Sequence, residues 1–422
     1  MLIFVEDRGQ LGIPKLENFV SPFVSAPAFR YFYRKQEAAR HNQTRKLRFP
    51  RLFLLSPFTI FAKKEKIDMI DPNELFYPAV DLLCKLIATP SPSREESATA
   101  DLIAEYLQEY GFTPQRAANN VWAIAPGFVP GRPTLLLNSH HDTVKPVDGW
   151  HGEAFTPRED GDRLYGLGSN DAGASLVSLL QAFIVLASRK EPYNLIFLAS
   201  AEEEVSGANG VALALKELPP ITFGVVGEPT GMRPAIGEKG LMVLDCTVMG
   251  KSGHAARNEG INAIYEAMPI IDQFRKFAFP KVSRMLGPVK LSVTQIKAGT
   301  QHNVIPDRCE FVVDVRTNEL YSNEEAFELL RDAIPCTIVP RSFRLNSSRI
   351  DREHPFMQRA AMLQLEPFGS PTLSDQAQMP FTTVKIGPGA SERSHTAGEY
   401  IDKEEIRQAI ALYLRLLDGL SL

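Results

Sequence analysis

The sequence has few cysteines, no long apolar run and little net charge. Its 4 cysteines lie far apart among 422 residues, and no two of them form a CxxC pair. This spacing argues against a disulfide framework and favours a reducing, cytoplasmic setting. No apolar run is long enough to cross a bilayer, and a net charge of −4 gives no general attraction for nucleic acid. We therefore expect a cytoplasmic protein without a membrane or nucleic-acid partner.

The motifs of covalent hydrolases are also missing. The chain contains no GxSxG nucleophile elbow, and no cysteine lies in a catalytic context. The composition is that of an ordinary globular protein, with 44% hydrophobic and 23% charged residues. The length favours two domains over one.

Residues 1–68 differ from the rest of the chain. They carry 13 Lys and Arg against 6 Asp and Glu, a balance of +7, whereas the remainder carries 33 against 44, a balance of −11. Their apolar stretch, 49–62, contains two prolines and lies too far along the chain for a signal peptide. We interpret 1–68 as an atypical extension that is disordered or lies upstream of the true start, for which Met69 is the candidate. N-terminal sequencing of the native protein tests this hypothesis, and a terminus at Met1 would refute it.

Beyond residue 72, short apolar runs alternate with helical patterns. Five such runs, at 120–126, 133–139, 193–200, 222–227 and 381–387, are typical of strands in a buried parallel sheet. Their alternation with helices predicts an α/β domain with a mainly parallel central sheet, built from residues 69–237 and 350–422. The helix that follows residue 93 should be capped by Ser93, with Glu96 three residues later as in a capping box, and Gly111 should end it.

Residues 238–349 follow a different pattern. Strands and helices are expected in the order β-α-β-β-α-β, which is the split βαβ unit. An apolar strand of the larger domain returns afterwards, at 381–387. The sequence therefore predicts a small α+β domain inserted into the α/β domain.

Acids and histidines gather where the predicted strands end. In open α/β sheets, ligands bind outside the carboxyl ends of the strands. One polar residue after a strand is usually a solvated turn, but five positions that mix histidines with carboxylates indicate a shared site. These positions are His140 with Asp142 after 133–139, Glu202 to Glu204 after 193–200, Glu228 after 222–227, His395 after 381–387, and Asp171 at the start of the long helix near 173–190.

Two histidines and several carboxylates suit zinc, and they can hold two ions if one carboxylate bridges them. A pair of ions can make a nucleophile from water and polarise a carbonyl group. The reaction then needs a carboxylate base that is not a ligand, and the acidic triplet 202–204 offers one beside a ligand.

In these motifs the chain resembles the zinc-dependent family of acetylornithine deacetylases, succinyl-diaminopimelate desuccinylases, aminoacylases and carboxypeptidases. Five motifs occur in the family's order: "HHD", "NDAGA", "AEEEVSG", "GEPT" and "SHTAGE". The resemblance runs from about residue 75 to the C-terminus. It includes the insertion 238–349, which resembles the family's dimerisation or lid domain and implies a homodimer.

The resemblance implies two Zn²⁺ ions per subunit, which Co²⁺ or Mn²⁺ can replace. "NDAGA" departs from the commoner Asp-x-Lys-Gly-Gly, which leaves the ligand in place and changes the pocket wall. The implied ligands are His140 and Glu228 for one ion, Glu204 and His395 for the other, and Asp171 shared between them.

The catalytic roles also follow from the resemblance. Glu203 would take a proton from the attacking water and pass it to the leaving amine. Asp142 would orient His140, with His141 a bystander. The "GKSGHAA" motif would place His254 over the active site of the partner subunit, where it would stabilise the oxyanion.

Three further residues are expected to bind substrate. They are Asn303 in "GTQHNVIPD", Arg316 in "DVRT" as a fork for an α-carboxylate, and Arg393 as an additional anion-binding candidate.

The expected substrate is a small N-acyl amino acid. Details such as "SAEEEVSG" and "GEPTGMRPAIGEKGL" look closest to the acetylornithine deacetylase branch. This implies removal of an acetyl or succinyl group from an N-acyl-L-ornithine or N-acyl-L-citrulline in arginine biosynthesis. The alternatives are a succinyl-diaminopimelate desuccinylase and a dipeptidase or carboxypeptidase with the same zinc pair. A non-enzymatic binding module would require a missing ligand or base, and none is missing.

Overall fold

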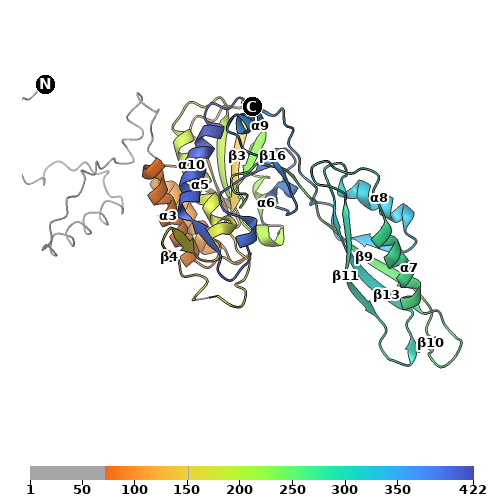
Figure 1. Cartoon of the computed structure of the whole chain (residues 1–422). Helices are drawn as coiled ribbons and strands as arrows, with labels where there is room; N and C mark the ends of the chain where they lie inside the picture. Colours follow the sequence, from red (N-terminus) through yellow and green to blue (C-terminus); the bar gives the residue numbers. More distant parts are fainter. Residues whose placement is uncertain (1–71, 151) are drawn as a thin grey trace, which may run out of the picture. The chain divides into compact units, whose positions relative to one another are not determined.

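The structure, a computed structural model, describes residues 72–150 and 152–422 (Figure 1). The predictions for residues 1–68, including the candidate start at Met69, therefore lie outside the described residues.

The larger sheet has eight strands in the order β1-β2-β6-β3-β7-β16-β8-β15. The neighbours β6 and β3, β3 and β7, β7 and β16, and β8 and β15 run parallel, whereas β1, β2 and the β16–β8 pair are antiparallel. This confirms the mixed α/β fold with a mainly parallel central sheet. The strands are β1 (Gln115–Ala117), β2 (Asn120–Ile124), β3 (Thr134–His140), β6 (Asn194–Ser200), β7 (Phe223–Val226), β8 (Ala235–Glu238), β15 (Phe368–Ser370) and β16 (Thr382–Lys385).

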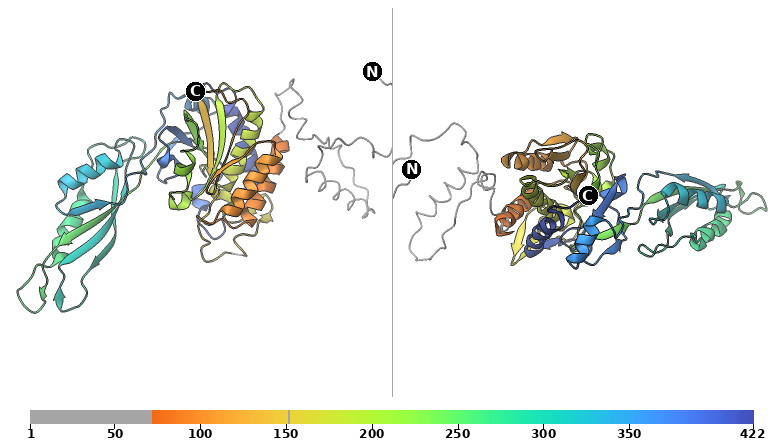
Figure 2. Two further views of the ribbon diagram at one scale, coloured as in Figure 1. Left: turned by 180° about the vertical axis from the view of Figure 1, so that it is seen from behind. Right: turned by 90° about the horizontal axis from the view of Figure 1, so that it is seen from above.

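Both faces of this sheet are covered, which explains why its strands are apolar without alternation. Leu135 and Leu137 of β3 pack into one cluster, and Leu136 packs into a second cluster with Val211 and Ala214. On the first face α3, α5 and α10 lie side by side (Figures 1 and 2). The helices of this domain are α3 (Pro72–Ala88), α4 (Ser97–Glu109), α5 (Ala174–Ala187), α6 (Val211–Ala214), α9 (Pro355–Met362) and α10 (Lys403–Leu417).

Helix α5 is the most apolar helix of the core. Together with the turn before it, the segment Ser169–Ala187 is long and apolar enough to cross a membrane, with a mean hydropathy of 1.4. The expectation that no apolar run is long enough to cross a bilayer is therefore wrong for this segment. However, 89% of the segment is buried inside the protein, because β3, β6, α3 and α10 all contact it. Its composition is thus that of a core helix.

The start of α4 differs from the prediction. The helix begins at Ser97 with Glu96 at its N-cap position, so Ser93 does not cap it. The Ser93 hydroxyl instead donates to the carboxylate of Asp142 at 2.7 Å. The Ser93 hydroxyl therefore bonds to a residue far away in the sequence instead of capping the helix. At the other end of the helix, Gly111 has a positive φ of 83°, which is typical of the residue that ends a helix.

The inserted segment forms its own four-stranded antiparallel sheet, in the order β11-β13-β9-β14. Two helices pack on it, which gives the order β-α-β-β-α-β along the chain. A two-stranded ribbon, β10 (Gly253–His254) with β12 (Val304–Ile305), extends from it. The elements are β9 (Met242–Met249), α7 (Ala263–Lys276), β11 (Lys290–Ala298), β13 (Arg308–Arg316), α8 (Asn323–Ala333) and β14 (Thr337–Pro340).

A small three-stranded sheet lies near the C-terminal helix. It has the order β17-β5-β4, with β17 (Tyr400–Asp402) between His395 and α10, and with β4 (Arg158–Asp160) and β5 (Arg163–Tyr165) ahead of the turn that holds Asp171. This pairing links two segments of the chain that each carry one predicted metal ligand.

Candidate metal centre

His140 is the last residue of β3 and is almost fully buried. Its Nδ1 lies 3.0 Å from the backbone oxygen of Asp142 and 3.4 Å from its carboxylate. With Nδ1 donating in this direction, Nε2 is free to face a ligand. Nε2 lies 3.3 Å from Asp171 and 3.9 Å from Glu228.

Asp142 connects two strand ends. Its carboxylate accepts the backbone N–H groups of Glu203 at 3.1 Å and Glu204 at 3.2 Å, in the short 3₁₀ turn η2 (Glu203–Val205) after β6. It also accepts the Ser93 hydroxyl. One buried carboxylate therefore orients the imidazole of β3 and fixes the backbone of the acidic triplet.

Glu204 and His395 meet although 191 positions separate them in the chain. The His395 Nε2 lies 3.0 Å from one Glu204 oxygen and 3.1 Å from the other, and 3.6 Å from Asp171. Asp171 lies in the turn η1 (Ser169–Gly173) that precedes α5. Its two carboxylate oxygens thus face different imidazoles, with Oδ1 toward His140 and Oδ2 toward His395.

Ligand atoms of these residues fall into two overlapping groups. His140, Asp171 and Glu204 offer atoms that all lie within 4.8 Å of one another, and so do His140, Glu203 and Glu228. The second group includes Glu203, to which the resemblance gives the role of base and no bond to metal. By distance alone, Glu203 is as close to His140 and Glu228 as a ligand would be.

The carboxylates of the site are costly to hold as anions without a cation. Burial raises the pKa of Glu203 well above its ordinary value, against the opposing influence of His140. Burial also raises the pKa of Glu228 to about 8. The hydrogen bond to Glu204 raises the pKa of His395 to about 9. These directions show negative charge concentrated in a desolvated site, which a divalent cation would relieve.

The donor set fits a pair of divalent metal ions. Imidazole nitrogen and carboxylate oxygen are the ligands that zinc accepts in catalytic sites. Asp171 has one oxygen toward each histidine, as a bridging carboxylate requires. Asp142 lies beside Nδ1 of His140, on the side of the ring opposite the ligand cluster, as is usual for the carboxylate partners of metal-bound histidines. The same donors suit cobalt and manganese, so they do not select the metal.

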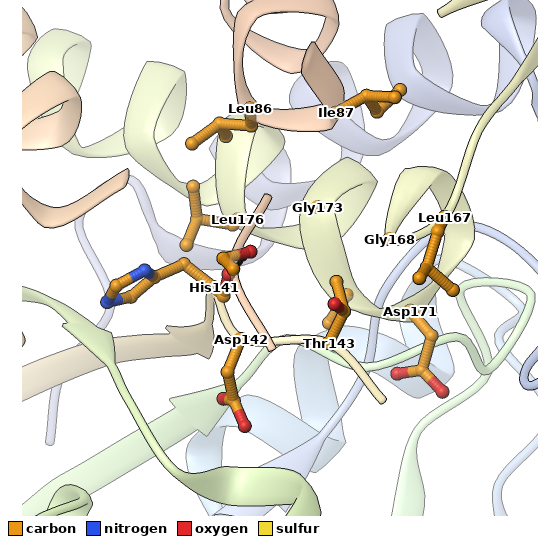
Figure 3. A pocket seen from close by; sticks show the side chains of 12 residues that line it. Leu86, Ile87, His141, Asp142, Thr143, Leu167, Gly168, Asp171, Gly173 and Leu176 are labelled. Atoms are coloured by element: carbon orange, nitrogen blue, oxygen red, sulfur yellow. Dashed lines mark hydrogen bonds between the residues drawn. The ribbon is translucent and has the colours of Figure 1, made fainter. Parts of the chain in front are cut away.

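His141 takes no part in the ligand cluster. Figure 3 shows its ring turned away from the carboxylates of Asp142 and Asp171. Its Nε2 hydrogen-bonds to the backbone oxygen of Asn119 at 2.9 Å, and its Nδ1 lies 2.9 Å from the Thr99 hydroxyl. Burial lowers the pKa of His141. It is a satisfied core histidine.

A cavity lies behind the ligands, and it is too small for a substrate. Leu86, Ile87, Leu167 and Leu176 line it together with the backs of Asp142 and Asp171 (Figure 3). Its volume of about 20 Å³ holds one water molecule at most.

His254 and Asn303 are brought together within the inserted domain. His254 pairs with Val304 in the β10–β12 ribbon, and the N–H of Ala255 donates to the Asn303 backbone oxygen at 3.0 Å. The His254 Nδ1 accepts the N–H of Ala256 at 3.1 Å. The neutral ring therefore carries its proton on Nε2, which makes this nitrogen a hydrogen-bond donor.

The two arginines expected to bind substrate are already paired. Arg316 makes a two-pronged contact with Asp314 on the same strand, at 2.8 and 3.1 Å. Arg393 contacts Glu405 of α10 at 2.6 Å, and its guanidinium lies over the ring of Tyr400. A substrate carboxylate would have to compete with these partners.

Three further buried residues, which no motif predicted, hold the ligand-bearing segments. Asp375, at the start of the 3₁₀ turn η3 (Asp375–Gln378), accepts hydrogen bonds from Asn138 of β3 at 3.0 Å and Ser200 of β6 at 2.6 Å. Glu399 and Asn170 lie beside Asp171 and His395. No pattern marks a lone acid in a loop, but Glu399 stands in the quoted "SHTAGE", and Asn170 stands in "NDAGA" directly before a predicted ligand.

Comparison with protein families gives two matches. The model of the peptidase dimerisation domain of the M20 family matches residues 236–335, and the model of peptidase family M28 matches residues 120–227. The first covers the inserted sheet, and the second covers the segments that carry three of the predicted ligands, His140, Asp171 and Glu204.

Individual proteins match over most of the chain. Acetylornithine deacetylase of Shigella sonnei is 27% identical, and that of Proteus mirabilis is 25% identical. In both cases the alignment covers 81% of this chain and 97% of the relative. Among solved structures, the YXEP protein of Bacillus subtilis, a dinuclear metal-binding peptidase of the M20 family, has 18% identity and a TM-score of 0.62, over 82% of this chain and 98% of its own.

These matches agree with the site. The fold, the inserted domain and the convergence of histidines and carboxylates are those of a metal-dependent hydrolase. The chain therefore resembles the metallo-hydrolases of the M20 family over most of its length, and residues 236–335 match the peptidase dimerisation domain.

Proposed function

We propose that this protein is a zinc-dependent deacylase that removes the N-acetyl or N-succinyl group from an N-acyl-L-ornithine or N-acyl-L-citrulline, in the cytoplasm, as a step of arginine biosynthesis. The observation that carries the proposal is the convergence of His140, Asp171, Glu204, Glu228 and His395 around one shared carboxylate. Full-length similarity to acetylornithine deacetylases supports the choice of substrate.

In this proposal the two zinc ions supply Lewis acidity and an acidified water molecule. His140 and Glu228 hold one ion, Glu204 and His395 hold the other, and Asp171 is shared. Glu203 accepts the proton of the attacking water and returns it to the leaving nitrogen.

The partner subunit contributes His254 in this proposal. Its Nε2 is the donor that would face the oxyanion formed from the amide carbonyl. Asn303 lies beside it in the ribbon and would approach the same substrate. Mixing inactive His254→Ala and Glu203→Gln proteins tests the arrangement, because a mixed dimer has one intact site. Subunit exchange without any return of activity would refute catalysis across the dimer.

The substrate is tested by amine release from four compounds: N-acetylornithine, N-acetylcitrulline, N-succinylcitrulline and N-succinyl-diaminopimelate. Preference for an ornithine or citrulline compound is the expected result, and it also names the acyl group. Activity on the diaminopimelate compound alone would assign the enzyme to lysine synthesis and overturn the proposed substrate while leaving the metal centre unaffected.

A peptidase is the second candidate, because the matching solved structures include a dinuclear peptidase. Both reactions break an amide bond beside an amino acid, so the metal centre does not separate them. A set of dipeptides added to the same assay does. Turnover of dipeptides at rates that exceed those of all four acyl compounds would replace the deacylase proposal.

A further inference from the structure

Two loops at the shared carboxylate each deliver one ligand. The segment 168–171 ends in Asp171, and the segment 389–395 ends in His395, whose Nε2 lies 3.6 Å from the Asp171 carboxylate. Neither segment belongs to a strand of the central sheet. The strand ends that position His140 and Glu228 therefore cannot position these two residues, and something else must set the distance between them.

Glu399 holds the segment 168–171 through hydrogen bonds to its backbone. It is 1% exposed, and its carboxylate accepts three backbone N–H groups of that loop. One oxygen accepts those of Asn170 at 2.8 Å and Asp171 at 2.9 Å, and the other accepts that of Gly168 at 3.2 Å. Glu399 lies four positions after His395, so the segment that carries one ligand fixes the backbone of the other.

Asn170 makes the reverse connection. This fully buried side chain donates from its amide nitrogen to the Ala390 backbone oxygen at 3.1 Å and to the Ser394 hydroxyl at 3.2 Å. Its amide oxygen accepts the N–H of Ala390 at 3.0 Å. The fit is close, because a Cβ at Gly389 would lie 2.3 Å from the Asn170 amide oxygen. Asn170 thus fixes both ends of the short segment that leads into His395.

We propose that Asn170 and Glu399 form a reciprocal clamp that sets the spacing of Asp171 and His395, and that both are positioning residues for the second metal ion. The inference rests on the proposed dinuclear centre. Six hydrogen bonds in all join the two loops through these side chains, three from each. Partners that fix metal ligands in this way typically change metal affinity by about 10- to 100-fold when they are replaced.

Two variants of the full chain test the clamp. Glu399→Gln keeps the size of the side chain but places an N–H₂ group against the N–H groups of the 168–171 loop. Asn170→Ala removes all three contacts to the 390–394 segment. Each is titrated with Zn²⁺ in competition with a chromophoric chelator, without substrate. We expect the weaker of two zinc affinities to fall at least about tenfold in both variants, and excess Zn²⁺ to restore kcat with little change in KM.

Two control variants separate positioning from general loss of stability. Asn323→Ala removes a buried asparagine of the inserted domain that donates to the backbone oxygens of Leu241 and Leu345. Tyr193→Phe removes a buried hydrogen bond to Leu417. Both should unfold at lower temperature and keep the affinity of the original chain for two zinc ions.

The outcomes are distinct. Wild-type zinc affinity in either folded clamp variant would overturn the clamp, and so would an equal loss of affinity in the controls. Glu399→Gln tests the hydrogen bonds to segment 168–171, and Asn170→Ala tests those to segment 390–394. If one variant fails to fold, the zinc affinity of the other still decides the proposal. If the unaltered chain itself fails to bind two zinc ions, the proposed function fails instead.

Discussion

At the scale of single residues, three neighbouring glutamates have three different environments. Glu204 faces His395, and Glu203 lies beside His140 and Glu228. Glu202 points elsewhere and accepts the backbone and side-chain N–H groups of Asn209 at 3.3 and 3.1 Å. Asp142 causes this separation, because it holds the N–H groups of Glu203 and Glu204 and so fixes the turn from which their side chains leave.

The role of Glu203 gives the first prediction. Glu203→Gln should lower kcat by about 10²- to 10⁴-fold, because the amide cannot accept the proton of the attacking water. Metal content, measured by mass spectrometry of the purified protein, should stay unchanged. Glu202→Gln is the matched control and should retain most of the activity. A Glu203→Gln enzyme with near-normal turnover would show that another group is the base.

At the scale of elements, the sheet delivers the ligands and a loop holds the strand ends together. Asn138 of β3 lies two positions before His140, and Ser200 of β6 lies three positions before Glu203. Both donate to the same oxygen of Asp375, which is fully buried. Burial raises the pKa of Asp375 to about 6.

Removing this link should destabilise the domain. Asp375→Ala leaves two buried donors without a partner, which should lower the free energy of unfolding by about 2 kcal/mol or more. Urea unfolding of the metal-free protein measures this loss directly. A decrease below about 0.5 kcal/mol, within the range of ordinary surface changes, would mean that Asn138 and Ser200 find other partners.

The sequence predicted the elements well because the strands are buried on both faces and end in chemically distinctive residues. Each strand end could be read separately, and the parallel order of β3, β6 and β7 brought His140, the acidic triplet and Glu228 together. The side-chain contacts around the site depend on residues far apart in the sequence, and local patterns do not encode such contacts. Ser93 looked like a helix cap and instead binds Asp142. No local pattern predicts the contacts of His354, which caps α9 and lies against the ring of Phe223.

The same limit applies to the substrate residues. Arg316 and Arg393 were chosen for their charge, but the sequence did not show that Asp314 and Glu405 would pair with them. Asp375 and Glu399 could not be found by spacing, because their partners are backbone or neutral groups far away in the chain.

At the scale of the whole molecule, the pKa values couple stability to metal and pH. In the metal-free protein, burial raises the pKa of Glu228 and of Glu399 to about 8, from an ordinary value of 4.5. The hydrogen bond to Glu204 raises the pKa of His395 to about 9. The folded state thus holds protons that the unfolded state releases. The contribution of these protons to the free energy of unfolding is present at low pH. It is lost as the pH rises through the folded-state pKa values of these groups.

Metal ions should reverse this trend, because they bind the deprotonated ligands. We expect the difference in unfolding temperature between metal-loaded and metal-free protein to widen as the pH rises from about 6 to about 8.5. Calorimetry at a buffered free-metal concentration measures it, with chelator in the reference sample. A difference that stays constant or narrows over this range would contradict the assignment of Glu228 and His395 to the metal centre.

Helix α7 of the inserted domain exposes large apolar side chains. On α7, Ala267, Ile270 and Phe274 are buried against the sheet, while Tyr265 and Met268 are 69% and 62% exposed. An outward helix face of a monomer is usually polar. This face, together with the match to the dimerisation domain, supports a homodimer through the insertion.

Charges on that face should break the dimer. The double variant Tyr265→Glu, Met268→Glu should sediment as a monomer and lose activity, because each site would lack the partner's His254. Met362→Glu is the control, since Met362 is 81% exposed on α9. A monomeric double variant with full activity would disprove the contribution of the partner subunit, and a dimeric one would place the interface elsewhere.

Counting the bound metal ions tests whether the five residues hold a two-metal centre. The purified chain is reconstituted with Zn²⁺, dialysed and analysed for bound metal and for amine release, beside the Glu204→Ala variant. Two ions per chain in the original protein, fewer in the variant, and hydrolysis that a chelator abolishes are the predicted results. Fewer than two ions in the unaltered chain, the same zinc content in Glu204→Ala, or hydrolysis that persists without metal would contradict a catalytic two-metal centre.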